Sequence, residues 1–141
     1  MHVTTVIFYL ALVAAPLDGA KTCTSEDMGK AEKVVFTWSP KEWSDVYKVY
    51  KKFGHCDDGA VGEGYSEAVA TLLGNRWGKF DQLNKLVSRD KRFERFVLDH
   101  INALMSVDEA RKIRGNAVAQ CTPAGKQLCE SIVKKLDQTS F

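Results

Sequence analysis

Apolar residues recur along most of the chain at the three- and four-residue spacing of an α-helix. The clearest stripe follows Asp90, and its inner side holds Phe93, Phe96, Val97, His100, Ile101, Leu104 and Met105. Residues at these offsets lie on one face of a helix, whereas no window shows the alternation of a half-buried strand. The pattern therefore predicts an all-α fold, a single compact bundle of five to six helices joined by short turns.

Residues that favour helix ends divide this pattern into segments. Each predicted start combines a capping side chain with a following apolar stripe, and the starts lie at Ser39–Pro40, Asp57–Asp58, Ser88–Asp90, Ser106 and Thr122–Pro123. Gly54 is expected to end the first of these helices in a left-handed conformation. The segment 21–37 lacks strong periodicity and is predicted to be an arm, with Val34–Phe36 available for a short extended piece.

An unbroken apolar run, Val6–Ala15, precedes all of these segments. It has the length of the apolar core of a secretory signal peptide and is too short to span a membrane. We expect residues 1–20 to be a signal peptide, cleaved after Ala20 or after Gly19. Residues 21–141 are then one secreted, extracellular domain, for which no membrane span is expected.

Charge and motifs narrow the range of functions. All 20 Lys and Arg and all but one of the 18 Asp and Glu follow Ala20, so the expected mature chain carries a net charge of only +3. No nucleotide-binding loop, metalloprotease helix or nucleic-acid module is recognisable. The sequence gives no reason to expect a cofactor, a metal or a nucleic-acid partner.

Four cysteines, Cys23, Cys56, Cys121 and Cys129, follow the predicted leader. An even number in an oxidising compartment favours two disulfides, for which three connectivities are possible. We favour Cys121–Cys129, because a gap of seven residues across a helix-to-helix turn can fold back on itself, and this leaves Cys23 for Cys56. Zinc ligation is disfavoured because there is no Cys-x-x-Cys pair.

The densest cluster of polar residues and glycines lies between His55 and Tyr65. Its candidate binding residues are His55, Asp57, Asp58, Glu63 and Tyr65. The carboxylates could act as acid and base or bind a hard cation, although Asp57-Asp58-Gly59 lacks the alternation of a calcium loop. The structural alternative, which we favour, is that Asp57 or Asp58 caps a helix, Glu63 is an exposed acid of its first turn, and the glycines make close packing contacts.

A second possible chemical motif overlaps this cluster. Gly64–Ala68 matches Gly-x-Ser-x-Gly at all but its last position, with Ser66 at the place of the nucleophile. We interpret the match as accidental, because such a serine needs a strand-to-helix turn and Ser66 lies within a helical stripe. His100, on an apolar side, is expected to be a hydrogen-bonded core histidine rather than a base.

Basic residues gather at the start of one predicted helix and form a candidate polyanion patch, Arg89, Lys91, Arg92 and Arg95. Such a patch could bind a sulfated glycan. Asp90, Glu94 and Asp99 lie among these bases, so an ordinary solvated face is the favoured interpretation.

These observations lead to the expectation of a secreted, disulfide-tied binding or interaction module without catalysis. Its partner would be an extracellular protein or a small apolar ligand held between helices, with Trp77, Phe93, Phe96 and Met105 as possible lining residues. The alternative is a small hydrolase or metal-dependent enzyme that uses the cluster at 55–63. The enzyme requires these side chains to converge in a concave pocket, whereas the binding module allows them to diverge along a helix start.

Overall fold

The computed structural model describes residues 21–141, and the predicted signal peptide lies outside them. The described chain forms α-helices and short 3-10 turns without a strand, which confirms the all-α prediction. The α-helices are α1 (Ser25–Thr37), α2 (Trp43–Phe53), α3 (Gly59–Asn75), α4 (Phe80–Arg89), α5 (Lys91–Asp99), α6 (Val107–Ala119) and α7 (Lys126–Gln138). The 3-10 turns are η1 (Gly54–Cys56), η2 (Trp77–Lys79) and η3 (Pro123–Gly125).

The described residues contain seven α-helices rather than the predicted five to six, and α1 lies where an arm was predicted. The Thr24 hydroxyl caps α1 by accepting a hydrogen bond from the Asp27 N–H. Only Ala31 and Val35 of this helix are buried, so its apolar stripe is too narrow to stand out in the sequence. Packing of α1 against α2 and α3, which the sequence does not reveal locally, stabilises it.

Several predicted helix boundaries are wrong by a turn or more. The helix predicted from Ser39–Pro40 begins at Trp43, because the Asp45 carboxylate accepts the N–H groups of Lys41 and Glu42 and so fixes the chain outside the helix. Helix α2 does end directly before Gly54, as predicted, but Gly54 is not left-handed: its φ is −60° and the chain continues into η1. The last helix begins at Lys126, preceded by η3.

The stripe predicted to run to Met105 is divided, because α5 ends at Asp99. The Asn102 amide occupies the backbone groups that a continued helix would use: its nitrogen donates to the Asp99 carbonyl and its oxygen accepts from the Leu104 N–H. Ile101 and Met105 are still buried at helical spacing. Periodicity thus predicted most of the inner residues correctly, but Leu104, also predicted on the inner side, is 64% exposed because the backbone leaves the helix before it.

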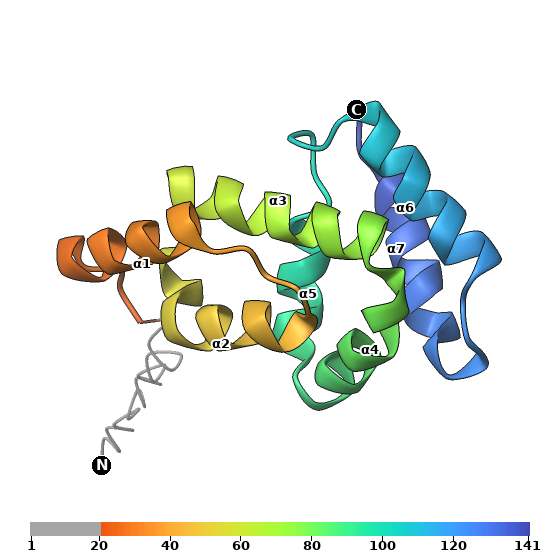
Figure 1. Cartoon of the computed structure of the whole chain (residues 1–141), viewed down its shortest axis with the longest axis horizontal. Coiled ribbons are helices and arrows are strands. Elements are labelled where there is room, and N and C mark those ends of the chain that lie inside the picture. Colours follow the sequence, from red (N-terminus) through yellow and green to blue (C-terminus); the bar gives the residue numbers. More distant parts are fainter. Residues whose placement is uncertain (1–20) are drawn as a thin grey trace, which may run out of the picture.

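The centre of the fold is α3, which runs along the long dimension of the molecule (Figure 1). Its buried side chains include Val61, Tyr65, Val69, Leu72 and Leu73, each at most 1% exposed. Helix α1 packs on it near its start, and α6 packs on it from the opposite end of the molecule. Helices α6 and α7 form an antiparallel pair at this far end, on the right in Figure 1.

Both disulfides have the favoured connectivity. Cys23–Cys56 joins the segment before α1 to η1, and Cys121–Cys129 joins the end of α6 to the first turns of α7. No helix of the described chain combines the length and the hydropathy needed to cross a membrane.

The glycines at the start of α3 have identifiable packing roles. Gly59 has a φ of +51°, a conformation that a side chain disfavours. A Cβ on Gly62 would lie 3.1 Å from the Asp57 carboxylate, and one on Gly64 would lie 2.8 Å from Cβ of Val35 in α1. Gly64 therefore allows α1 and α3 to approach closely.

The contact at Gly64 predicts opposite effects for two glycine substitutions. Gly64→Ala should lower the free energy of unfolding by about 1–3 kcal/mol, because the added methyl group overlaps Val35 and must separate two packed helices. Gly115→Ala, in the exposed middle of α6 with no atom within 4 Å of its Cβ, should raise it by about 0.5–1 kcal/mol.

Urea unfolding of both variants, with the disulfides intact, measures these changes. If both substitutions stabilise the protein, the close approach of α1 and α3 at Gly64 is not a constraint.

Candidate functional site

The most organised group of polar side chains is a hydrogen-bonded relay of Asn102, Ser66, His100 and Asp57, in which Ser66 and His100 are buried and Asp57 lies at the surface. Ser66 Oγ lies 2.8 Å from His100 Nδ1, and His100 Nε2 lies 3.0 Å from the Asp57 carboxylate. Asn102 Nδ2 donates to Ser66 Oγ at 3.0 Å. The relay joins the middle of α3, the end of α5 and the junction between η1 and α3.

The hydrogen bonds assign every proton of this relay when His100 is neutral. Asn102 uses its oxygen to accept from the Leu104 N–H, so its nitrogen faces Ser66. The Asp57 carboxylate can only accept, so the proton of a neutral imidazole lies on Nε2 and points to Asp57. His100 Nδ1 is then an acceptor, and the Ser66 hydroxyl donates to it while the serine oxygen accepts from Asn102. Ser66 and His100 are 4% and 5% exposed, so each polar atom is both buried and satisfied.

A shallow pocket of about 390 Å³ lies outside the relay. It is lined by Glu63, Ser66, Glu67, Ala70, Leu104, Met105 and Glu109. Its charged groups are all carboxylates, and Glu109 also accepts the Ser106 N–H as part of the cap of α6.

The relay contains a serine, a histidine and an aspartate in hydrogen-bond contact, which is the arrangement of an activated nucleophile. Acyl transfer also needs donors for an oxyanion, and Ser66 lies inside α3, where backbone N–H groups bond to carbonyls one turn earlier. The adjoining carboxylates would raise the energy of a developing negative charge. The geometry therefore favours a structural role, in which the relay fixes the end of α5 on α3.

Ser66 and His100 were each considered from the sequence, but the relay itself was not predicted. Asp57 contacts His100 from 43 residues away, and Asn102 contacts Ser66 from 36 residues away. The spacing of residues within a short segment cannot predict contacts between residues so far apart in the chain. The one informative feature of the sequence was the place of His100 on an inner helix face, which predicted a hydrogen-bonded core histidine. The structure confirms this prediction.

The other candidate residues between 55 and 65 lie in different surroundings. His55 Nε2 is 2.9 Å from the Asp27 carboxylate, and this hydrogen bond, helped by the charge of Lys21, lowers the pKa of Asp27. Asp58 caps α3 by accepting the Gly59 N–H. Tyr65 is fully buried and donates to the Val49 carbonyl at 3.3 Å. Its burial raises the pKa of its hydroxyl.

These side chains therefore diverge. His55 faces α1, Asp57 faces His100, and Glu63 lines the acidic pocket. Within residues 21–141, no three His, Cys, Asp or Glu side chains come together in a way that could hold a metal ion.

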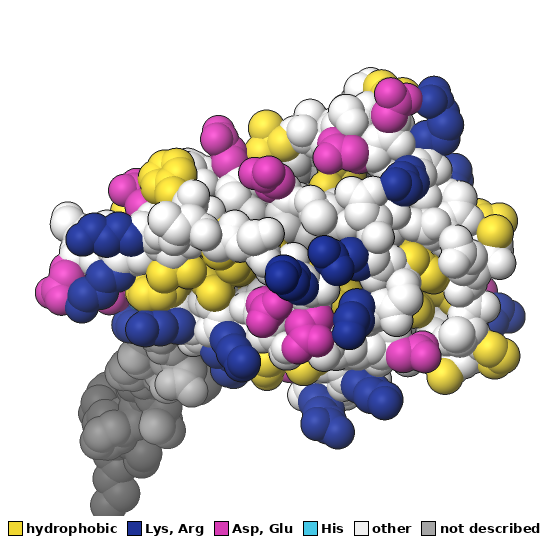
Figure 2. Space-filling model, in the orientation of Figure 1, with side chains coloured by type: hydrophobic (Ala, Val, Ile, Leu, Met, Phe, Trp, Pro, Cys, Tyr) yellow, Lys and Arg dark blue, Asp and Glu magenta, His cyan; other side chains and the backbone are white. Residues whose placement is uncertain are grey.

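The predicted polyanion patch is distributed over two grooves. Lys91 and Arg95 lie between α5 and α7 with Lys134 and Lys135, where Glu94 and Asp99 also line the groove. Arg92 instead lines a groove with Lys21, Lys51 and His55, and Arg89 belongs to the last turn of α4. Figure 2 shows Lys and Arg side chains interspersed with Asp and Glu over one face. A sulfated-glycan partner stays a prediction.

The four residues considered for an apolar cavity are packed in the core. Trp77 stacks on Phe80 with ring centroids 4.4 Å apart, and Phe93 and Phe96 pack on each other and on Tyr50. Met105 is 5% exposed and forms part of the wall of the acidic pocket.

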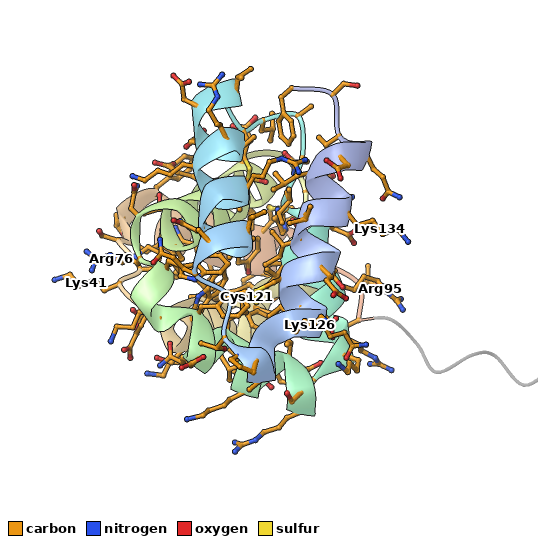
Figure 3. All side chains as sticks on the ribbon, turned by 90° about the vertical axis from the view of Figure 1, so that its right-hand side faces the viewer. Lys41, Arg76, Arg95, Cys121, Lys126 and Lys134 are labelled. Carbon is orange, nitrogen blue, oxygen red and sulfur yellow. A yellow bond between two sulfur atoms is a disulfide. The ribbon has the colours of Figure 1, made fainter. Side chains whose placement is uncertain are left out.

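A largely apolar groove of about 420 Å³ lies between α6 and α7 and is here called the α6–α7 groove. Its apolar lining consists of Ala117, Val118, Val133 and the Cys121–Cys129 disulfide. Its charged lining consists of Lys126, Glu130, Lys134 and Asp137, all from α7. Figure 3 looks at this end of the molecule, with Cys121 where the two helices are joined and with Lys126 and Lys134 along α7.

Val118 is the feature of this groove that is hardest to explain by folding, because its side chain is 69% exposed. Val133, across the groove, is only partly buried. The sequence did not single out this surface. The only sequence feature that marks the groove is a valine close to a turn closed by a disulfide, and this feature is too common to indicate a site.

The comparisons with known proteins give no family assignment: no protein-family model, no curated protein and no solved structure matches the chain.

The structural role of the relay predicts a loss of stability when its hydroxyl is removed. Ser66→Ala leaves His100 Nδ1 without a donor in a buried position, which should lower the free energy of unfolding by about 1–3 kcal/mol. Ser131→Ala is the matched control, because that hydroxyl bonds only to the Gln127 carbonyl one turn earlier and lies at the surface. The control should change stability by less than about 0.5 kcal/mol.

Chemical unfolding followed by circular dichroism compares the two variants. Equal stability of Ser66→Ala and Ser131→Ala would show that the relay does not hold the fold.

Proposed function

We propose that this chain is an exported interaction module that binds another protein through the α6–α7 groove and acts without catalysis. The observation that carries the proposal is the exposure of Val118 beside Val133 and a disulfide in a largely apolar groove. Exposed apolar surface bordered by charged side chains is typical of protein interaction sites.

Export is supported by two independent features of the chain. The apolar run Val6–Ala15 has the length of the core of a signal peptide. All four cysteines are paired in disulfides, which persist in oxidising compartments such as the extracellular space.

The shape of the groove favours a protein over a small apolar ligand. Small-molecule sites are clefts or cavities deep enough to bury about 70–90% of the ligand surface. The α6–α7 groove is open along its length, and charged side chains of α7 border it. A partner helix or strand that lies along this groove can contact both the apolar lining and these charges.

Site-specific photocrosslinking tests the groove as a binding site. A photoreactive phenylalanine analogue at Val118 should give a defined crosslinked species in the extracellular fluid of the source organism, because its side chain would be covered by the partner. The matched control is the analogue at Phe36, which is 71% exposed but lies in α1 at the other end of the molecule.

Mass spectrometry identifies the crosslinked species and the residue of attachment. The proposal is contradicted if position 118 gives no crosslink, or if positions 36 and 118 give the same set of products.

Acyl transfer at Ser66 is a second candidate function, favoured by one observation, the contact of Ser66 with His100 and of His100 with Asp57. The lack of oxyanion donors and the acidic surroundings count against it. The other enzymatic alternative, which uses His55, Asp57, Asp58 and Glu63, needs a convergence that these side chains do not have.

A fluorophosphonate probe discriminates between the two functions, because it reacts covalently with activated serines. We expect no labelling of the folded protein beyond that of the Ser66→Ala variant. Labelling that maps to Ser66 by mass spectrometry, and that is lost in Ser66→Ala, would establish an activated nucleophile and overturn the non-catalytic proposal.

A further inference from the structure

We infer that the partner of the α6–α7 groove is a second copy of the same chain, bound antiparallel with a two-fold axis beside the middle of α7. This inference rests on the proposed function, because it identifies the occupant of the groove named there. The evidence is the order of charges along α7 and the apolar side chains at the centre of the same groove.

The charged residues that line the groove alternate in sign along α7. From start to end of the helix they are Lys126, Glu130, Lys134 and Asp137. The order is cation, anion, cation, anion, so the sequence of signs is reversed when the helix is read backwards. An antiparallel copy of α7 therefore presents an anion wherever the first copy presents a cation.

A two-fold axis near Ile132 brings these charges into register. It sets Glu130 beside Lys134 of the second copy and, by symmetry, Lys134 beside Glu130 of the second copy. Lys126 comes beside Asp137 of the second copy in the same register. Each contact occurs twice, as required for a dimer in which both subunits use the same surface. A parallel arrangement would place like charges together.

The existing ion pairs leave these charges available. Lys126 and Glu130 are 3.8 Å apart with side chains 78% and 66% exposed, so their pairing is loose and solvated. Among the ion pairs of residues 21–141, none includes Lys134. Asp137 is paired with Arg114 across the groove and would be shared with the second copy.

The apolar part of the contact lies at the centre of the same surface. Val133 is next to the proposed axis, and Val118 reaches it from α6. Association of two α6–α7 pairs would cover these side chains and form a four-helix arrangement. The apolar lining is short, so the contact area belongs with interfaces below about 1,200 Å², which form weak or transient complexes.

Charge reversal on α7 tests the inference directly. Disulfide-bonded protein obtained by expression of the full chain is studied by sedimentation equilibrium between about 10 µM and about 1 mM. We expect the wild-type protein to dimerise in this range. Glu130→Lys and Lys134→Glu should each weaken self-association at least about tenfold, because each places like charges at both symmetric contacts.

A mixture of the two single variants provides the diagnostic result. In Glu130→Lys both positions, 130 and 134, carry a cation, and in Lys134→Glu both carry an anion. The two variants should therefore form a heterodimer with each other, although each has a weakened homodimer. The double variant, with both reversals, should dimerise like the wild type. Only an antiparallel contact with this register accounts for all of these results together.

Lys135→Glu is the matched control, since Lys135 follows Lys134 on α7 but lines the α5–α7 groove and not the α6–α7 groove. It should leave the dimer unchanged, and thermal unfolding of every variant should confirm that the fold is retained.

A wild-type protein that stays monomeric throughout this range would overturn the inference, as would single variants that dimerise like the wild type or a mixture that does not associate. If position 118 still crosslinks to a different protein in that case, the proposed function stands and only the second copy is excluded. If position 118 crosslinks to nothing, both proposals fail.

Discussion

The burial of α3 on nearly all sides is the constraint on which the rest of the fold depends. Val61, Tyr65, Val69, Leu72 and Leu73 share one face of this helix, and Ser66, Ala70 and Gly74 on its other sides are buried as well, so α3 must be covered from several directions. One side is covered by α1, which can approach because Gly64 lacks a side chain, and the far end is covered by α6. The polar relay from Ser66 then fixes the end of α5 against the same helix.

The sequence predicted what depends on periodicity and on local capping. The all-α class, a helix cap at Asp57 or Asp58, the start of α6 at Ser106 and the disulfide pairs all follow from residues close together in the chain or from the redox chemistry of cysteine. The sequence did not predict α1, whose helical state depends on packing of its short apolar stripe, or the end of α5, which depends on hydrogen bonds of Asn102. Both depend on side chains whose contacts are not visible in a local window.

The candidate site shows the same division. Residues 55–65 were selected because polar residues and glycines are dense there, yet the structure uses them for a helix cap, a bond from His55 to α1 and a core hydrogen bond. The chemical groups are thus occupied in holding the fold. Folding leaves apolar side chains exposed elsewhere, among them Val118 at the opposite end of the molecule.

The two disulfides differ in what they contribute to the protein. Loop-closure entropy gives about 3.7 kcal/mol for the bridge between Cys23 and Cys56, which are 33 residues apart, and about 2.5 kcal/mol for Cys121–Cys129, which are eight apart. The shorter bridge closes a loop that the α6–α7 connection would form in any case, so much of its effect is local. It removes conformational freedom from the wall of the α6–α7 groove before anything binds there. Binding at this wall would therefore cost less conformational entropy of the chain than binding at an unrestrained turn.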